Sequence, residues 1–235
     1  MGVLGAVTIE SFYNMLSKRN PAKQYTSCPD LLFPDTIVYK WIQPSSWFNG
    51  ATPNQCTQLR REKIVASTVM RQFCDSNDPK AVVATYLNIT QDKDGSDVGE
   101  TEYFTAEQLE QFLEYRSKKS NVGLLQKFVP SKGNEMRTYR VTWSPAFMQI
   151  EVRKNVLNKD NHRKPLVDRM VTFEGPPHLS QCYARSTTRN LRNQIKQMCE
   201  SIYRHVRDTG NVTISRMVLY LRLDADDNLW LLFCS

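Results

Sequence analysis

The segment 136–153 alternates apolar and polar side chains with a period of two, on both sides of a Ser-Pro-Ala turn at residues 144–146. Its apolar positions are Tyr139, Val141, Trp143, Met148, Ile150 and Val152. Successive side chains of a β-strand point to opposite faces, so this period predicts two adjacent antiparallel strands, each with one buried face. Such a sheet has to bury its apolar face against another layer, which the rest of the chain must supply.

The segment 187–208 has the pattern of a helix that covers a sheet. Its apolar stripe recurs at helical spacing and consists of Leu191, Ile195, Met198, Ile202 and Val206. The opposite face is basic and carries Arg189, Arg192, Lys196, Arg204 and Arg207. One apolar stripe beside one charged face is typical of a surface helix packed on a core, and the basic face is a candidate partner-binding surface.

Periodicity and capping signals predict the remaining elements. Further helices are expected at 8–19, with Thr8 as N-cap, at 57–74, and at 105–119, where Thr105 and Gln108 form a capping box. Further strands are expected at 81–90, 166–173, 212–223 and 229–234, the last two joined by an Asp-rich turn. The predicted fold class is therefore α+β, a mostly antiparallel sheet packed against helices.

Residues 20–56 contain five prolines with aromatic residues between them. We interpret them as a Pro- and aromatic-rich extended N-terminal arm, which lies either on the protein's own body or on a partner. Trp41, Trp47 and Phe48 are the candidate anchors for a partner's groove, because aromatic side chains bury a large area at low entropic cost. The predicted organisation is a helix and arm at 1–56 and an α+β domain at 57–235, which we expect to be truncated because the chain stops directly after an apolar run.

Charge is unevenly distributed along the chain. The whole chain has 31 Lys and Arg against 24 Asp and Glu, a net of +7, but residues 116–222 carry +14 and residues 91–114 carry −7. A body this basic predicts an acidic partner: a nucleic acid, an anionic membrane or an acidic protein polymer such as the microtubule. Motifs of nucleic-acid-binding modules are missing, and the 187–208 helix lacks the wide apolar face of a membrane-surface helix. We therefore expect no membrane partner, and a protein polymer is favoured.

Signatures of catalysis and of metal binding are missing as well. There is no G-x-S-x-G elbow, no Gly-rich phosphate loop ending in Lys-Ser or Lys-Thr, and no H-E-x-x-H. The six cysteines are widely spaced and favour free thiols in a reducing compartment over disulfides or zinc. The acidic segment 92–109 resembles only a degenerate calcium-binding EF-hand, and a solvated loop before a capped helix explains it better. We predict no catalytic residue, no metal, no cofactor and no small-molecule substrate.

Two stretches in the C-terminal half are similar to a known protein family. One runs from Tyr139-Arg-Val-Thr-Trp-Ser-Pro145 to Arg169-Met-Val-Thr-Phe-Glu-Gly175, and the other from Ile214-Ser-Arg-Met-Val218 to Leu229-Trp-Leu-Leu-Phe-Cys-Ser235. Over about residues 124–235 the chain resembles a poorly characterised ciliary or flagellar (axonemal) family of ciliated and flagellated eukaryotes. The resemblance implies a structural component of the axoneme, and it carries no catalytic residues to transfer.

The sequence therefore predicts a non-enzymatic structural component of the axoneme, located in the cytoplasm on the cytoskeleton of the cilium or flagellum. It would bind microtubule doublets, through tubulin or other axonemal proteins, with its basic face and its aromatic arm. The alternative is a nucleic-acid-binding protein that uses the same basic face, with an affinity that falls steeply with salt. An enzyme is the third class, and the sequence shows no converging ionisable groups to support it.

Overall fold

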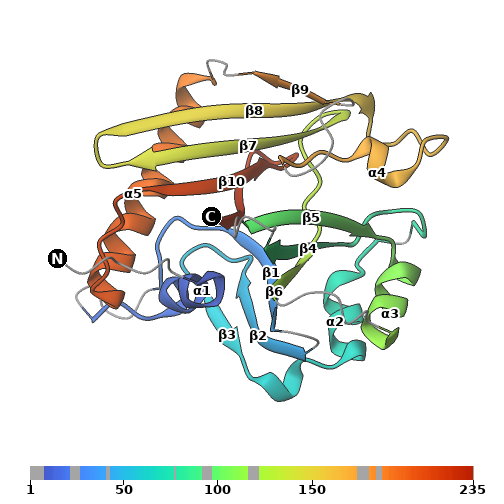
Figure 1. Cartoon of the computed structure of the whole chain (residues 1–235), viewed down its shortest axis with the longest axis horizontal. Helices are drawn as coiled ribbons and strands as arrows, with labels where there is room; N and C mark the ends of the chain where they lie inside the picture. Colours follow the sequence, from blue (N-terminus) through green and yellow to red (C-terminus); the bar gives the residue numbers. More distant parts are fainter. Residues whose placement is uncertain are drawn as a thin grey trace.

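A computed structural model of the chain describes residues 8–21, 27–40, 43–76, 78–91, 97–115, 122–173, 180–183 and 187–234. The elements fall into two antiparallel sheets and the helices that cover them (Figure 1). The helices are α1 (Ile9–Ser17), the 3₁₀ turn η2 (Arg61–Lys63), α2 (Ala66–Phe73), α3 (Ala106–Tyr115), α4 (Leu166–Arg169) and α5 (Arg189–Gly210). The predicted α+β class is confirmed.

The chain completes one sheet before it starts the other. The six-stranded sheet has the order β3-β2-β1-β6-β4-β5 and consists of β1 (Phe33–Lys40), β2 (Gln43–Gly50), β3 (Thr57–Leu59), β4 (Ala84–Gln91), β5 (Asp97–Phe104) and β6 (Val122–Lys127). The five-stranded sheet has the order β11-β10-β7-β8-β9 and consists of β7 (Glu135–Ser144), β8 (Phe147–Asn158), β9 (Ser180–Tyr183), β10 (Met217–Leu223) and β11 (Leu229–Cys234). Residues 128–134 connect the two sheets.

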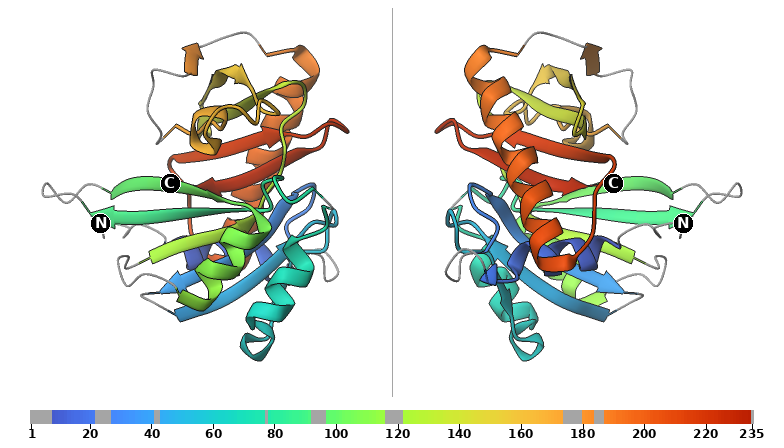
Figure 2. Two further views of the ribbon diagram at one scale, coloured as in Figure 1. Left: turned by 90° about the vertical axis from the view of Figure 1, so that its right-hand side faces the viewer. Right: turned by 90° about the vertical axis from the view of Figure 1, so that its left-hand side faces the viewer.

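The alternating segment forms the central hairpin of the five-stranded sheet, as predicted. Val141 of β7 lies opposite Ile150 of β8 on one side and Leu219 of β10 on the other, and all three are buried. The helix α5 packs on this apolar face with Ile195 and Ile202 fully buried (Figure 2). The period-two strands and the helical stripe were therefore two halves of one core.

The described part of the predicted arm is a hairpin inside the six-stranded sheet. β1 pairs with β2 on one side and with β6 on the other, and β2 pairs with β3, so the boundary predicted after residue 56 falls within one sheet. Trp47 and Phe48 of β2 are 1% and 0% exposed and lie in the cores on opposite faces of the sheet. Their prediction as surface anchors is corrected, since strand pairing buries both rings. Trp41 lies outside the described residues.

A buried carboxylate orders this hairpin. Asp35 of β1 is 2% exposed and accepts hydrogen bonds from Trp47 Nε1 (2.8 Å) and Asn49 Nδ2 (2.9 Å) at one oxygen. Its other oxygen accepts from Gln72 Nε2 of α2 (3.3 Å). Three donors compensate a carboxylate that has lost its water, and the third ties α2 to the sheet.

Two local predictions are wrong. The segment 57–74 is divided into β3, η2 and α2, because residues 57–59 pair with the edge of β2. The strand predicted at 166–173 is replaced by the short helix α4 and irregular chain. Asn155 of β8 explains this, because its side-chain amide donates to the carbonyls of Asp168 (2.8 Å) and Met170 (2.6 Å).

Other local signals hold. The capping box of α3 is confirmed, because the Thr105 amide donates to Gln108 Oε1 (3.0 Å) and the Gln108 amide donates to Thr105 Oγ1 (3.4 Å). β10 and β11 form the predicted hairpin. The described thiols are free, at Cys28, Cys56, Cys74, Cys199 and Cys234. Residues 92–96 of the calcium-like acidic segment lie outside the described residues.

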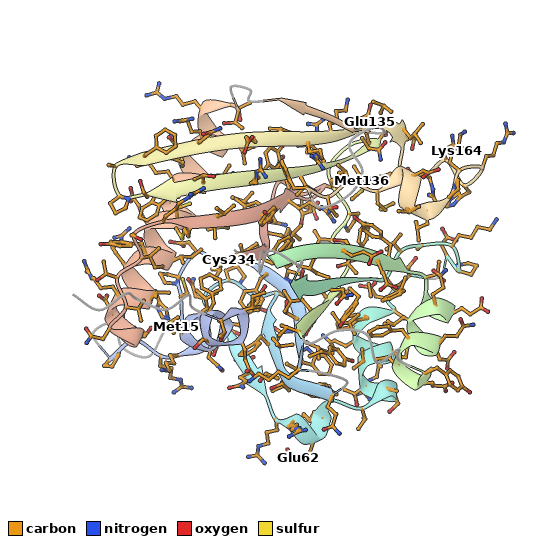
Figure 3. The ribbon with its side chains drawn as sticks, in the orientation of Figure 1. Met15, Glu62, Glu135, Met136, Lys164 and Cys234 are labelled. Atoms are coloured by element: carbon orange, nitrogen blue, oxygen red, sulfur yellow. The ribbon has the colours of Figure 1, made fainter. Side chains whose placement is uncertain are left out.

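The two sheets are joined by hydrogen bonds as well as by the connecting segment. The Leu231 amide of β11 donates to the Leu32 carbonyl (2.8 Å), and Gln126 Nε2 of β6 donates to the Leu232 carbonyl (2.5 Å). Figure 3 shows Cys234 where the sheets meet and Met136 on the side of the five-stranded sheet that faces the six-stranded one. No described helix is long and apolar enough to cross a bilayer.

Candidate functional site

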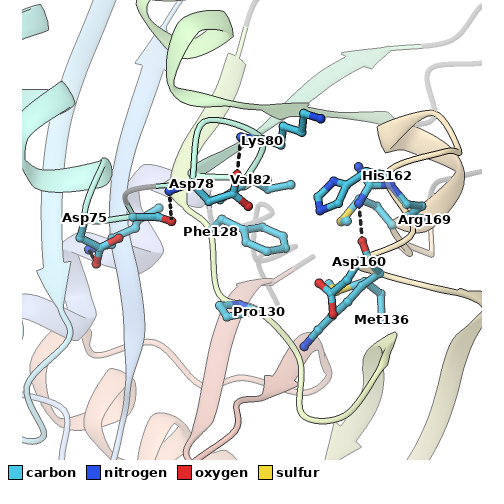
Figure 4. Close-up of a pocket in the computed structure, with 15 residues that line it drawn as sticks. Asp75, Asp78, Lys80, Val82, Phe128, Pro130, Met136, Asp160, His162 and Arg169 are labelled. Atoms are coloured by element: carbon cyan, nitrogen blue, oxygen red, sulfur yellow. Dashed lines mark hydrogen bonds and ion pairs between the residues drawn. The ribbon is translucent and has the colours of Figure 1, made fainter.

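A cavity of about 370 Å³ opens where the two sheets meet, beside the connecting segment. We call it the inter-sheet cleft. One wall is formed by residues 75–76 and 78–82, which lead into β4, and the opposite wall is the segment 159–170 that leaves β8 and contains α4 (Figure 4). Between them lie Phe128, Pro130 and Met136, from the end of the six-stranded sheet and the start of the five-stranded one. The cleft therefore draws on three segments far apart in the sequence.

Arg169, at the end of α4, is the buried cation of this cleft. Its side chain is 6% exposed, and one of its terminal nitrogens donates to the Lys159 carbonyl. Its Nε is buried without a hydrogen-bond partner, and among the described residues no carboxylate pairs with the guanidinium. A buried charge without a counter-charge is costly, so this position favours an anion supplied from outside the chain.

Four more basic side chains line the same cleft: Lys80, Lys127, Lys159 and His162. Lys159 Nζ donates to the Ser131 carbonyl (3.0 Å), which holds the lysine against the connecting segment. Lys80 and His162 project from opposite walls and are exposed (Figure 4). Within the described part of the chain, neither of these two side chains makes a hydrogen bond or an ion pair.

The described lining also contains three acidic side chains, Asp75, Asp78 and Asp160. Asp75 pairs with Lys127 (2.8 Å). Asp78 accepts a hydrogen bond from the backbone amide of Lys80 (2.9 Å) and not from its ammonium group. Asp160 makes no side-chain ion pair with a described residue. Against the four Lys and Arg side chains of the described lining, these three carboxylates leave a formal excess of one positive charge, and the buried guanidinium of Arg169 is the part of the cleft that favours an anionic ligand.

An apolar surface lies next to the cationic groups. It consists of Val82, Phe128, Met136 and Met170, which belong to one small core cluster. Phe128 is held edge-on to Tyr103, with ring centroids 6.4 Å apart, and its amide donates to the Val83 carbonyl (2.9 Å). A fixed aromatic ring beside cations suits a ligand that is anionic at one end and flat and apolar at the other.

The predicted basic face of α5 lies elsewhere. Its five residues are at positions 189, 192, 196, 204 and 207 of a helix that covers the other face of the five-stranded sheet, and none of them lines the cleft (Figure 1). Glu200 pairs with both Lys196 (3.8 Å) and Arg204 (3.6 Å), and Asp208 pairs with Arg207 (3.3 Å). Binding of tubulin, another protein or a nucleic acid by this face stays a prediction.

Sequence reasoning missed the cleft residues because they do not form a motif. Arg169 appears in the sequence only as part of a predicted strand, and Lys80, Lys159 and His162 are isolated charges in loops. The excess of basic residues between 116 and 222 was a usable signal, because a solvent-exposed surface does not by itself require so many basic side chains. That signal did not distinguish an exposed face from a cleft.

Comparison with known proteins finds only distant structural similarities. No family model matches the chain, and no curated protein matches it by sequence. Among solved structures it is similar to D-cycloserine synthetase DcsG (14% identity, TM-score 0.48, 97% of this chain and 64% of that one) and to the D-alanine-D-alanine ligase from Coxiella burnetii (6%, 0.48, 97% and 47%). It is also similar to the VanG D-Ala:D-Ser ligase from Enterococcus faecalis (9%, 0.45, 97% and 52%). Other matches are ATP-grasp ligases, one of them in complex with ADP.

These matches correct the sequence-based identification. The resemblance to an axonemal family, and with it the prediction of a non-enzymatic structural protein of the cilium, is contradicted because the similar structures are ligases. The chain spans about half the length of the solved structures it matches, 46% and 50% for two of them.

The described residues show no preformed metal centre. No three His, Cys, Asp or Glu side chains come together there in a way that would hold a metal ion. The predicted absence of a metal and of a cofactor stays a prediction.

Proposed function

We propose that the inter-sheet cleft binds a nucleoside triphosphate, with ATP as the probe of choice. The observation that carries the proposal is Arg169, a guanidinium that lines the cleft, is 6% exposed and has no carboxylate partner among the described residues. A phosphate group supplies the missing charge and accepts hydrogen bonds from the guanidinium fork, which is the geometry that arginine matches best.

The other cations extend this phosphate site across the cleft. Lys159 belongs to the same wall segment as Arg169. Figure 4 shows Lys80 on the wall opposite Arg169. A single phosphate would compensate one or two of these charges, whereas a di- or triphosphate reaches several of them. The spacing of these cations along the cleft therefore favours a polyphosphate over a monovalent anion.

The apolar surface accounts for the other end of the ligand. Phe128 offers an aromatic ring, and Val82 and Met170 offer apolar side chains against which a flat base packs. The volume of about 370 Å³ falls in the range of small-molecule sites, roughly 300–1,000 Å³. Free thiols and a nucleotide ligand both suit a reducing cytoplasm, and we propose that location for the chain.

The proposal is tested by calorimetric titration of the full chain with ATP, adenosine and tripolyphosphate at about 100 mM salt. We expect ATP to bind, and adenosine and tripolyphosphate each to bind at least about tenfold more weakly, because each retains only one half of the contacts. Equal affinity for ATP and tripolyphosphate would contradict the proposed contact between the base and the apolar surface of the cleft. If titration with 1 mM ATP gave no heat of binding, the proposed nucleotide site would be contradicted.

Replacement of Lys159 by glutamine is expected to weaken ATP binding about three- to tenfold, since one partly buried charge is lost from the phosphate end. Lys164 provides the matched control, because it belongs to the same segment but points into solvent (Figure 3). Lys164→Gln should leave the affinity unchanged. If both variants lose affinity equally, the effect is one of net charge and the cleft is not the binding site.

A further inference from the structure

A second, smaller cavity of about 30 Å³ lies between the two sheets. The six-stranded sheet lines it with Thr85 of β4, Thr101 of β5 and Gln126 of β6, and the five-stranded sheet contributes Arg222 of β10. The described lining also contains Lys127 and contains no Asp or Glu. Within the part of the chain that the structure describes, this small space is therefore bordered by positive charge that its own walls do not neutralise.

Arg222 is the most buried cation of the described structure, at 3% exposed. Its two terminal nitrogens donate to the Val129 carbonyl (2.9 Å) and to Thr138 Oγ1 (3.2 Å), and its guanidinium lies 5.4 Å from the ring centre of Phe128. These contacts hold it in place but supply no negative charge. Burial lowers the pKa of Arg222, which is the expected response of a cation without a counter-charge.

Two of the buried polar atoms at this cavity, Nε of Arg222 and Oγ1 of Thr101, have no hydrogen-bond partner among the described residues, and they come from different sheets. An N–H and an O–H donor that border one small space are satisfied by a single acceptor placed between them. The cavity is large enough for about one or two atoms of water size.

We propose that this cavity is a binding site for a small monovalent anion of the halide class, with chloride as the physiological form. A halide accepts from both donors at once and neutralises the buried guanidinium, whereas water satisfies the hydrogen bonds but leaves the charge. The volume of about 30 Å³ favours a single-atom anion over a phosphate or a carboxylate-bearing molecule. The site is independent of the nucleotide proposed for the inter-sheet cleft, and its tests contain no nucleotide.

Bromide locates the site directly. Crystals of the full chain grown in sodium bromide should show an anomalous scattering peak within hydrogen-bond distance of Arg222 Nε and Thr101 Oγ1. A water-sized peak without anomalous signal at that position would overturn the proposal. The measurement does not depend on any substitution, so it stays decisive if variants of this buried region fold poorly.

Thermal unfolding tests the same site in solution. Sodium chloride should raise the melting midpoint above that in sodium gluconate at equal ionic strength, by about 3–5 °C once chloride exceeds its dissociation constant tenfold. Arg222→Met should lose the difference between the two salts, and Thr101→Val should reduce it. Thr142 on β7 does not line the cavity, so Thr142→Val is the matched control and should keep the difference in melting midpoint between the two salts. Equal midpoints of the unmodified chain in both salts would contradict the proposal.

Discussion

Replacement of Arg169 by methionine is expected to weaken ATP binding about 10- to 150-fold and to leave the melting midpoint unchanged or higher. The loss of affinity follows from the removal of a charge-assisted hydrogen-bond donor, which is worth roughly 1.5–3 kcal/mol. The retained stability follows from the burial of the side chain, because an apolar residue of similar length avoids the cost of an unpaired buried charge.

Measured together, ATP affinity and the melting midpoint distinguish an arginine that binds the ligand from an arginine that only stabilises the fold. If Arg169 served mainly to hold the Lys159 carbonyl, its loss would lower the melting midpoint along with the affinity. Arg189→Met is the matched control, since Arg189 is exposed on α5 and does not line the cleft. It should change neither quantity. An unchanged ATP affinity of Arg169→Met in calorimetry would contradict the nucleotide site.

Replacement of Trp47 by alanine is expected to lower the free energy of unfolding by about 3–5 kcal/mol, as measured by urea denaturation. The indole is 1% exposed, packs edge-on against Phe73 with ring centroids 6.1 Å apart, and donates to Asp35 at 2.8 Å. Its removal opens a cavity beneath α2 and takes one of three donors away from a buried carboxylate.

Tyr115 is the matched control for this experiment. It is 80% exposed at the end of α3, so Tyr115→Ala should change the free energy of unfolding by less than about 0.5 kcal/mol. A similarly small effect of Trp47→Ala would mean that β2 does not pack as described. It would restore the prediction of an exposed aromatic arm.

Local patterns predicted the elements whose stability is decided over a few neighbouring residues. The hairpin of β7 and β8 and the helix α5 each repeat one apolar period over four or more positions, and the capping box at Thr105 satisfies its own hydrogen bonds. Proline spacing misled the interpretation of residues 20–56, because Pro34 and Pro44 both lie within strands of the sheet. Because prolines are typical of loops, a hairpin that contains prolines within its strands has the same composition as a loop.

The candidate site was not accessible to the same reasoning. Asp78, Phe128 and Arg169 belong to segments about 40–50 residues apart in the sequence, and only the meeting of two sheets brings them to one cavity. The burial of Arg169 depends on α4, a single turn whose carbonyls are held by Asn155 rather than by a strand partner. No short-range pattern encodes that contact.

The sequence by itself determined the α+β class, the alternating hairpin, the covering helix and the excess of basic residues, because each follows from side-chain period or from composition. The tertiary structure decided where the charge acts. Arg169 and Arg222 are buried between sheets without carboxylate partners among the described residues, while the basic residues of α5 remain at the surface. Burial removes water from a charge and so creates a demand for an anion, and burial is a property of the packed chain.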